Sequence, residues 1–353
     1  MVPSMWSDGS SWNKWDLHVH VPGTVRANGY GPATEINVGR FCRALHDSDV
    51  AAFGLTDYFR VETCLAVRAR FYELYGKTKL LLVNLEVRLA AGGAEHKADA
   101  HLIFSPELSD GRIRSIMSRL PCRYSTQAEG SREAFLADFG DSTVPGGLHA
   151  VDLATLLKAI GSEDARHVLA VVPAGKDGFT FATTSDLVRA KSAALRDRAH
   201  AVFGNPTDAA RHAKERQAGG PWKGPVFAGS DCHSWEDLSG RLGQAIEGSE
   251  RDSYITWIKS EVTWDGWEAP VLRSTCCESW VDVVVDGKGG RGRKLAGRRA
   301  RRASRAACFR PRARRLGSAR RGQAAAVGCS AAQAAAKATG VRRPRAEWRR
   351  RAL

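Results

Sequence analysis

The stretch Trp15-Asp16-Leu17-His18-Val19-His20 places two histidines two residues apart near the N-terminus. Side chains alternate between the two faces of an extended strand, so His18 and His20 point the same way and can bind one ion. A single His-x-His pair is weak evidence, because most such pairs are ordinary surface or core histidines. Here other residues of metal-ligand type lie in or beside further apolar runs: Glu86, His101, Asp231 and His233. The sequence therefore predicts a metal site assembled from several strands.

Apolar runs rich in β-forming residues alternate with stretches of helical period. The runs cover 15–20, 51–57, 80–89, 98–104, 167–174 and 225–231, and the clearest helices are predicted over 33–46, 64–75, 152–160 and 185–203. Asp152 and Ser185 have the character of helix N-caps, and Gly76, Gly161 and Gly204 stand where helices are expected to end. Near-continuous apolar strands separated by helices indicate a mainly parallel α/β sheet or barrel.

Ligand sites of such folds lie beyond the C-terminal ends of the strands. Most of the polar candidates obey this rule, because they end a run or lie late in it: His18, His20, Asp57, Glu86, Asp231 and His233. His101 is the exception. It falls early in the run at 98–104 and can join the others only on an antiparallel or irregular strand. Residues 105–166 contain Ser/Gly/Asp-rich stretches and are predicted to form an insertion over the mouth of the barrel.

The formal net charge of +15 over 353 residues is concentrated at the C-terminal end. Residues 288–353 contain 22 Lys and Arg against one acidic residue, whereas the rest of the chain has a net charge of −6. From about residue 269 to 353 the composition is rich in Arg, Ala and Gly and has no apolar period, which predicts a disordered basic tail. A shifted reading frame of a GC-rich gene, or truncation, would give the same composition.

Eight cysteines without a CxxC pair, and an N-terminus without an apolar signal segment, predict a cytoplasmic protein with reduced thiols. No run approaches 18 apolar residues, so we expect no membrane-spanning segment. The sequence makes no prediction of the oligomeric state.

The candidate ligands are chemically suited to a divalent ion of intermediate hardness. Imidazole suits zinc, iron, nickel and copper, and carboxylates favour manganese and magnesium, so the mixed set fits a borderline divalent ion. Six candidate ligands exceed one tetrahedral shell, which leaves one or two ions open. Such ions support hydrolysis of a phosphate ester by metal-activated water. Gly-x-Ser-x-Gly is absent, and Cys232 should face away from its two neighbours on a strand.

The ordered motifs resemble those of the PHP (polymerase and histidinol phosphatase) domain. The motifs are Asp16-Leu17-His18-Val19-His20, Leu55-Thr56-Asp57, Asn84-Leu85-Glu86-Val87, His101 and Gly229-Ser230-Asp231-Cys232-His233. Trp15 to Thr24, Leu55 to Phe59 and Tyr254 to Ser260 further resemble the PHP module of TrlF-type AAA-like ATPases. The resemblance covers residues 11–268. It implies a distorted (β/α)7 barrel with Mn, Zn or Fe at the strand ends and phosphoester hydrolysis as the activity. The expected partners are a phosphorylated substrate such as a nucleotide or nucleic acid, and an ATPase.

Three positions depart from the family pattern. Arg26 and Tyr58 stand where the family usually has ligand residues, and Val171 to Lys176 replaces an Ala-His-Pro-like motif. The chain also has no Gly-x-x-x-x-Gly-Lys-[Ser/Thr] phosphate-binding loop. Two alternatives to a phosphoesterase therefore stay open: a non-catalytic regulatory or docking module of an ATPase system, and nucleic-acid binding through the basic tail.

Further residues are candidates for catalytic or supporting roles. Arg26, Lys176 and Arg241 could neutralise substrate phosphate, or each could be a solvated surface charge. Asp57 could orient a ligand histidine as a hydrogen-bond acceptor, or it could cap backbone amides at a strand end. His149 could supply a replacement ligand.

Overall fold

The fold is taken from a computed structural model. It describes residues 12–89, 98–126, 130–139, 148–175, 193–195, 197–218, 224–244, 256–259, 261–265 and 283–285. All of these residues belong to one compact unit that spans 1–293. Among the described helices, none is long and apolar enough to cross a membrane.

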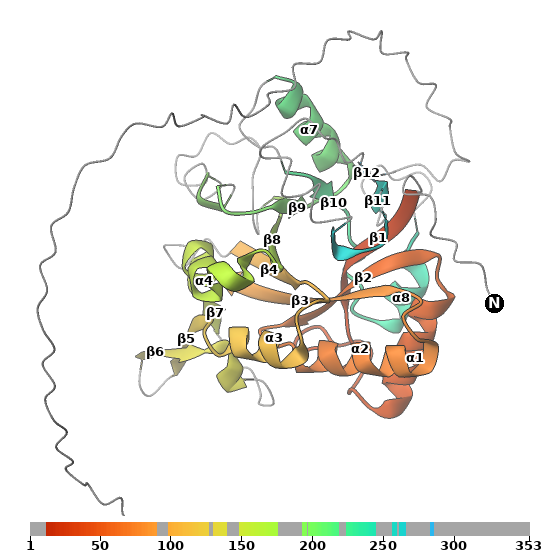
Figure 1. The fold of residues 1–353 in the computed structure, drawn as a ribbon, viewed down its shortest axis with the longest axis horizontal. Helices are drawn as coiled ribbons and strands as arrows, with labels where there is room; N and C mark the ends of the chain where they lie inside the picture. The colour runs from red at the N-terminus through yellow and green to blue at the C-terminus, as the bar shows by residue number, and fades with distance from the viewer. Residues whose placement is uncertain are drawn as a thin grey trace, which may run out of the picture. The chain divides into compact units, whose positions relative to one another are not determined.

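The described strands form one mixed sheet in the order β10-β9-β8-β4-β3-β2-β1-β11-β12 (Figure 1). Their bounds are β1 Trp12–His20, β2 Val50–Tyr58, β3 Leu80–Leu89, β4 Ala98–Phe104, β8 Val168–Pro173, β9 Ala201–Phe203, β10 Val226–Phe227, β11 Thr256–Lys259 and β12 Val283–Val285. Strands β1, β2 and β3 are parallel to one another, and so are β8, β9 and β10. The predicted α/β class with parallel strands is therefore confirmed.

Strand β4 runs antiparallel to both of its neighbours, β3 and β8. This reversal places the start of β4 beside the end of β3, so that His101 is the register partner of Glu86. The antiparallel strand that His101 required is thus present, and it places His101 of β4 beside Glu86, which lies late in β3.

The chain returns to β1 after β10. Val19 and Cys232 form an isolated parallel bridge, and the backbone N–H of His20 donates to the carbonyl of Cys232 at 3.1 Å. No ladder joins β10 to β1 in the part of the chain that the structure describes. The closed seven-stranded barrel therefore stays a prediction.

The two faces of the sheet have different contents, as β3 illustrates. Leu81, Val83 and Leu85 belong to the larger hydrophobic cluster, whose members also come from the helices. Leu82 points to the opposite face and belongs to a smaller cluster that includes Trp15, Phe203 and Phe227. Because side chains alternate along a strand, Asn84 and Glu86 share the face of Leu82. We call this opposite side the site face.

The helices are α1 Glu35–Asp47, α2 Glu62–Tyr75, α3 Asp110–Met117, α4 Leu153–Ile160, α5 Ser162–Ala165, α7 Pro206–Gln217 and α8 Trp235–Arg241. Helices α1, α2 and α3 lie in a row along one side of the sheet (Figure 1). The predicted N-cap Asp152 accepts a hydrogen bond from the Thr155 N–H, and Gly76 and Gly161 end α2 and α4 with positive φ. Cap residues and apolar period thus specified these helices locally.

One predicted helix is wrong at its C-terminal end. Residues 185–203 were expected to be helical, but Ala201–Phe203 forms β9, and Gly204 follows a strand. The short Ala-Val-Phe run carries no period of its own, and pairing with β8 decides its conformation. Ser185, the expected N-cap, lies outside the described residues.

The predicted insertion at 105–166 contains α3, α4, α5, a 3-10 turn at Leu136–Phe139 and three further strands. These are β5 Pro121–Thr126, β6 Gly130–Phe135 and β7 His149–Ala150. Ala150 of β7 pairs in parallel with Leu89, the last residue of β3, so this part of the insertion lies beside the C-terminal end of β3. Strand β12 lies beyond residue 268, the predicted domain end, and pairs with β11. The domain boundaries and the cover over the site stay predictions.

Close approach of β1 and β2 requires a glycine at Gly54. A Cβ atom there would overlap the backbone carbonyl of Leu17. We expect Gly54→Ala to lower the free energy of unfolding by about 1–3 kcal/mol, because the backbone must shift. Gly39 in α1 is a matched control with no atom within 4 Å of its added Cβ. Gly39→Ala should instead raise stability by about 0.5–1 kcal/mol. Urea unfolding of both variants tests the pair, and equal effects would contradict the close approach.

Candidate metal centre

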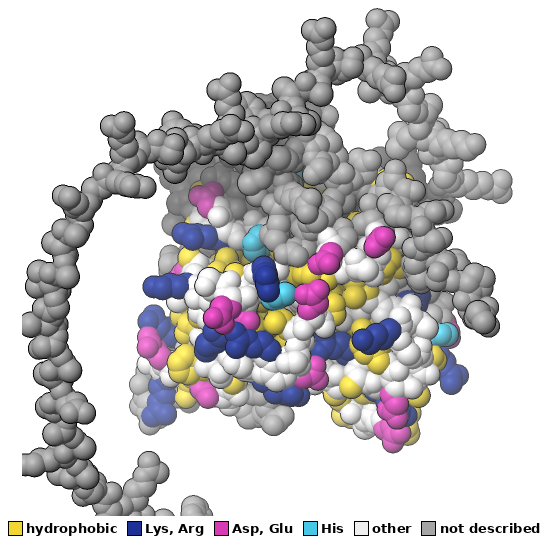
Figure 2. Space-filling view, viewed as in Figure 1, with side chains coloured by type: hydrophobic (Ala, Val, Ile, Leu, Met, Phe, Trp, Pro, Cys, Tyr) yellow, Lys and Arg dark blue, Asp and Glu magenta, His cyan; other side chains and the backbone are white. Residues whose placement is uncertain are grey.

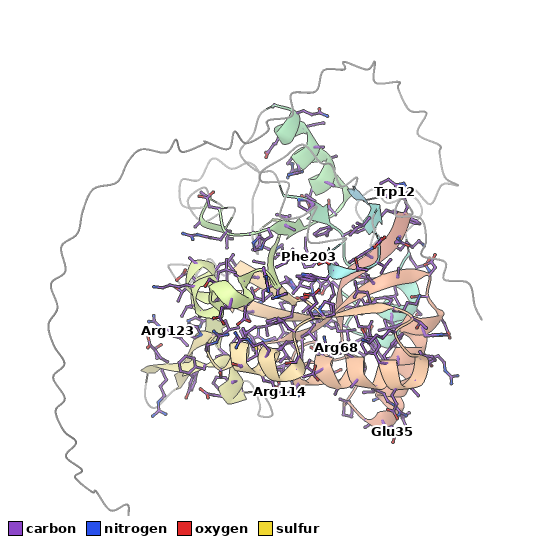
Figure 3. The ribbon with its side chains drawn as sticks, viewed as in Figure 1. Trp12, Glu35, Arg68, Arg114, Arg123 and Phe203 are labelled. Carbon is purple, nitrogen blue, oxygen red and sulfur yellow. The ribbon has the colours of Figure 1, made fainter. Side chains whose placement is uncertain are left out.

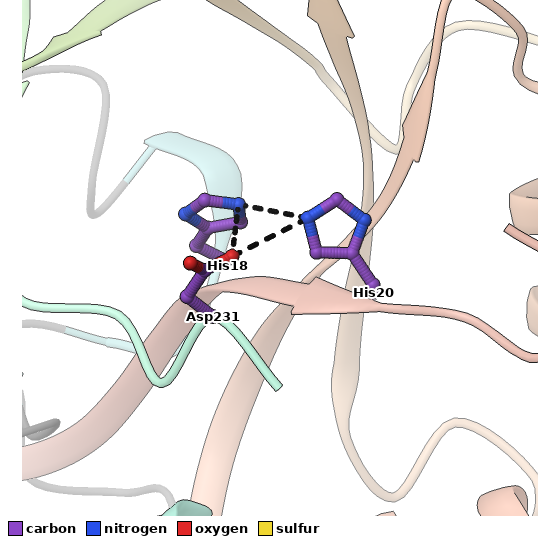
Figure 4. Close-up of side chains that lie close together, drawn as sticks. All are labelled: His18, His20 and Asp231. Carbon is purple, nitrogen blue, oxygen red and sulfur yellow. Dashed lines mark hydrogen bonds and ion pairs between the residues drawn. The ribbon is translucent and has the colours of Figure 1, made fainter. Parts of the chain in front are cut away.

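Four ligand atoms converge at the end of β1. His18 Nε2 lies 3.1 Å from His20 Nε2, 3.3 Å from Glu86 Oε2 and 3.1 Å from Asp231 Oδ1. His20 Nε2 lies 3.2 Å from Glu86 Oε2 and 3.4 Å from Asp231 Oδ1. Figure 4 shows the two imidazoles and the Asp231 carboxylate facing one another. The sequence prediction that strand ends from distant parts of the chain meet here is therefore matched by the geometry.

These separations are those of ligands around a single ion. Nitrogen and oxygen ligands bind zinc at about 2.0–2.2 Å, which places neighbouring ligands of one octahedral or tetrahedral ion roughly 2.8–3.6 Å apart. All five of the distances given above fall in that range. The Nε2 atoms of His18 and His20 thus lie at ligand separations from each other and from both carboxylates, those of Glu86 and Asp231.

His101 and His233 flank this set of four atoms. His18, Glu86 and His101 have ligand atoms that lie within 4.8 Å of one another, and form a second group that shares His18. His233 Nε2 lies 3.2 Å from Asp231 Oδ1, and its ring stacks on His20 with centroids 3.8 Å apart. All six predicted ligands therefore lie in one cluster.

Backbone contacts fix β1 against the segment that carries Asp231. The Asp231 N–H donates to the carbonyl of His18 at 2.8 Å. Asp16 Oδ1 accepts from the backbone N–H groups of His18 at 3.2 Å and Ser230 at 3.1 Å. Gly229 permits the approach, since an added Cβ would stand 2.6 Å from the Cβ of His18. Asp231 itself has a positive φ of 48°, a conformation unusual for a residue with a side chain.

A buried relay fixes the tautomer of His20. The Thr24 hydroxyl donates to Asp57 Oδ1 at 2.9 Å, so its oxygen is left to accept from His20 Nδ1, 3.3 Å away. The proton of a neutral His20 then resides on Nδ1, and Nε2 presents its lone pair to the ion. Asp57 also accepts from the backbone N–H groups of Val25 and Tyr58. Asp57 therefore caps backbone amides at the strand end, and it also supports His20, although only indirectly through the Thr24 hydroxyl.

A second relay fixes His101. Asn84 Nδ2 donates to the Leu17 carbonyl at 2.8 Å and to Thr56 Oγ1 at 3.0 Å, which determines the orientation of its amide. Asn84 Oδ1 is then an acceptor for His101 Nδ1, 3.2 Å away. The free Nε2 of His101 consequently faces the cluster. Sequence reasoning did not assign roles to Thr24 or Asn84, although the quoted motifs contain both.

Burial and charge oppose each other in the cluster. Burial by itself lowers the pKa of His18, but the carboxylates of Asp231 and Glu86 outweigh it and raise the pKa to about 9. Burial raises the pKa of both carboxyls, but the surrounding imidazoles outweigh it and hold both values below their ordinary range. Burial, together with the charge of His18, lowers the pKa of His101 to about 3. The cluster thus holds two carboxylates ready for a cation.

The cluster is open on one side. His20, Glu86 and His101 are buried, whereas 55 % of the Asp231 side chain is exposed. Phe203, which is labelled in Figure 3, has its ring 5.3 Å from that of His18 and 4.8 Å from that of His101. The buried ligands therefore have an apolar neighbour, and a substrate would approach past Asp231.

The predicted phosphate-binding cations have separate locations. Arg26 lies over the rings of Tyr58 and Phe59, and the Tyr58 ring stacks on His20 at 4.7 Å. Arg241 is at the far end of α8, where it pairs with Asp237 at 3.1 Å. Lys176 lies outside the described residues. His149 is in β7, outside both groups of candidate ligands.

Comparisons with protein families and with curated proteins gave no match. Three solved structures are similar at low identity. An amidohydrolase from Chromobacterium violaceum is 17% identical, with a TM-score of 0.35 over 63% of this chain and 89% of its own. A protein assigned as a metal-dependent phosphoesterase from Bifidobacterium adolescentis is 13% identical, with a TM-score of 0.36 over 68% of this chain and 99% of its own. PsfC from Pseudomonas syringae is 14% identical, with a TM-score of 0.32 over 75% of this chain and 97% of its own. At these scores the likeness assigns neither fold nor activity.

Loss of the Thr24 hydroxyl should weaken metal binding without unfolding the protein. Thr24→Val removes the acceptor for His20 Nδ1 and leaves Asp57 its other donors. We expect manganese or zinc affinity to fall about ten- to a hundredfold, measured by calorimetry. Thr24→Ser retains the hydroxyl and should retain the affinity. Equal affinities for the Val variant and the native protein would contradict the relay.

Metal affinity should rise with pH. A protonated imidazole cannot bind a metal, and the pKa of metal-free His18 is raised to about 9. An ion must therefore displace a proton throughout the range below pH 9, so affinity should increase from pH 6 to pH 9. Binding near pH 7 should release about one proton. Calorimetry in buffers of different ionisation enthalpy measures this release, and pH-independent affinity would contradict it.

Proposed function

We propose that this protein is a metal-dependent phosphoesterase. The observation that carries the proposal is the position of the His18 and His20 Nε2 atoms, which lie 3.1–3.4 Å from each other and from the carboxylates of Glu86 and Asp231. Its exposed side at Asp231 gives a substrate access to that ion. A purely structural site would be expected to be closed by protein on every side.

Four residues are proposed as ligands of the ion, and two further histidines lie beside them. His18, His20, Glu86 and Asp231 would bind it, and the two carboxylates would neutralise its charge. His101 and His233 stand beside them and could complete the shell or supply part of a second site. The mixed nitrogen and oxygen donors suit Mn, Zn or Fe. When bound, such an ion supplies Lewis acidity toward a phosphoryl oxygen and activation of water.

The protein's own groups would control orientation and exclude bulk water. Thr24 and Asn84 keep Nε2 of two histidines directed at the ion. Phe203 lies against two of the ligand rings and limits the access of water to them. Asp231 is the most exposed of the four proposed ligands, so an incoming substrate would meet this side of the centre first.

Phosphate ester chemistry is favoured by the order of the motifs. The five motifs resemble the PHP domain in sequence order, and the residues that carry the resemblance gather in one cluster. A PHP-type barrel and the TrlF-like assignment belong to the same proposal. The visible face of the described body carries interspersed acidic and basic side chains (Figure 2), so the case for an anionic substrate rests on the metal and on local cations.

Metal analysis combined with hydrolysis assays tests the proposal. The native full-length chain should contain a divalent metal and should hydrolyse p-nitrophenyl phosphate or bis(p-nitrophenyl) phosphate until a chelator is added. His18→Asn and Asp231→Asn should lose metal and turnover together. His46→Asn is the matched control, because His46 is a half-buried histidine in α1 that pairs with Asp47 and lies outside both groups of candidate ligands, and it should retain both.

Each outcome distinguishes one alternative. Metal that depends on His18 and Asp231, without any turnover, would favour the docking module over the enzyme. Absence of metal from protein prepared without chelator would overturn both. Turnover that survives chelation and both substitutions would show that a different site performs the reaction.

A further inference from the structure

Arg26 is held against aromatic rings at the edge of the candidate metal centre. Its guanidinium carbon lies 5.7 Å from the centroid of the Tyr58 ring and 5.2 Å from that of Phe59. Tyr58 in turn stacks on His20, and its ring is 6.1 Å from that of His233. Arg26 is thus separated from two of the ligand histidines by a single aromatic ring.

The loop that carries Arg26 is fixed on both sides of it. The Val25 N–H donates to Asp57 at 2.9 Å, and the Gly29 N–H donates to the carbonyl of His233 at 2.8 Å. Arg60 donates to the carbonyl of Gly23, which anchors the start of the same loop. The backbone near Arg26 is therefore tied to Asp57, which supports His20, and to the ligand residue His233. Its position relative to the ion is set before any substrate binds.

Arg26 differs from the other cations near the site in its partners. Arg60 pairs with Asp57, and Arg241 pairs with Asp237. Within the described residues Arg26 has no carboxylate partner, and its guanidinium is only partly buried. A guanidinium that stacks by its face keeps its N–H groups in its own plane, where they can bind a carboxylate or phosphate through two hydrogen bonds.

We propose that Arg26 recognises a second anionic group of the substrate, apart from the phosphoryl group held at the ion. This inference rests on the proposed function and specifies its substrate class. Because the Tyr58 ring lies in contact with both Arg26 and His20, the guanidinium is set back from the metal ligands. It therefore meets a more distant part of the substrate. The favoured substrate is a phosphate ester whose other half carries its own negative charge.

Two small phosphates test this selectivity. Glycerol 3-phosphate and 3-phosphoglycerate share a three-carbon skeleton, and only the second has a carboxylate in addition to its phosphate. Binding of each to the manganese-loaded full-length chain is measured by calorimetry at about 0.15 M salt, which screens the basic tail. The native protein should prefer 3-phosphoglycerate by about tenfold or more, as expected for a charged hydrogen-bonded pair.

Substitutions assign the preference to Arg26. Arg26→Ala should abolish the preference while manganese affinity stays unchanged, and Arg26→Lys should restore only part of it, because the planar fork is lost. Arg40→Ala is the matched control. Arg40 also stacks on an aromatic ring, that of Trp235 at 4.0 Å, but it is exposed on α1. This variant should retain the full preference.

Three results would overturn the inference. A native protein that binds both phosphates equally has no second anionic subsite. Arg26→Ala that weakens both ligands to the same extent would place the guanidinium on the ion-bound phosphoryl group instead. Arg26→Ala that keeps the preference would assign it to another residue. A native chain that binds none of manganese, zinc and iron would overturn the proposed function itself, which is a failure distinct from these three.

Discussion

The pairing of β1 with the segment after β10 is the constraint on which the site depends. Asp16 lies at its centre, because one buried carboxylate oxygen accepts backbone N–H groups from both segments. Burial raises the pKa of Asp16 to about 6, despite these hydrogen bonds. The chain thus buries an ionisable group to hold together residues that are more than 200 positions apart. The pairing of these two segments brings Asp231 to the imidazoles of His18 and His20. Without that pairing, Glu86 would be the one carboxylate among the remaining candidate ligands.

The clustering of the candidate ligands could be predicted from sequence, whereas the groups that orient them could not. Strand ends are visible as apolar runs that finish in polar residues, and topology gathers such ends at one edge of a sheet. His101 needed one extra fact, the reversal of β4, which periodicity does not encode. Thr24 and Asn84 carry no periodic signal at all. Their roles depend on side-chain directions that only the packed structure supplies.

The failures of sequence reasoning have similar physical causes. The end of the predicted helix at 185–203 became β9 because pairing with β8 outweighed local preference. Asp57 could not be assigned to one of two roles, since a carboxylate with four donors around it fulfils both. Arg26 and Arg241 were equivalent as charges in the sequence. The structure distinguishes them because Arg241 is paired within α8, whereas Arg26 lies over Tyr58, whose ring stacks on the candidate ligand His20.

A metal centre of this kind has an energetic cost in the absence of its ion. Buried carboxylates and imidazoles crowd within hydrogen-bonding distance, and a folded protein tolerates this only when opposite charges or a cation compensate. In the metal-free state His18 fulfils that role by holding a proton between Asp231 and Glu86. A divalent ion would replace that proton with two positive charges, so the same carboxylates that destabilise an empty centre would favour the cation. The hydrogen bonds of Thr24 to His20 and of Asn84 to His101 hold the two imidazoles in the orientation that such an ion requires.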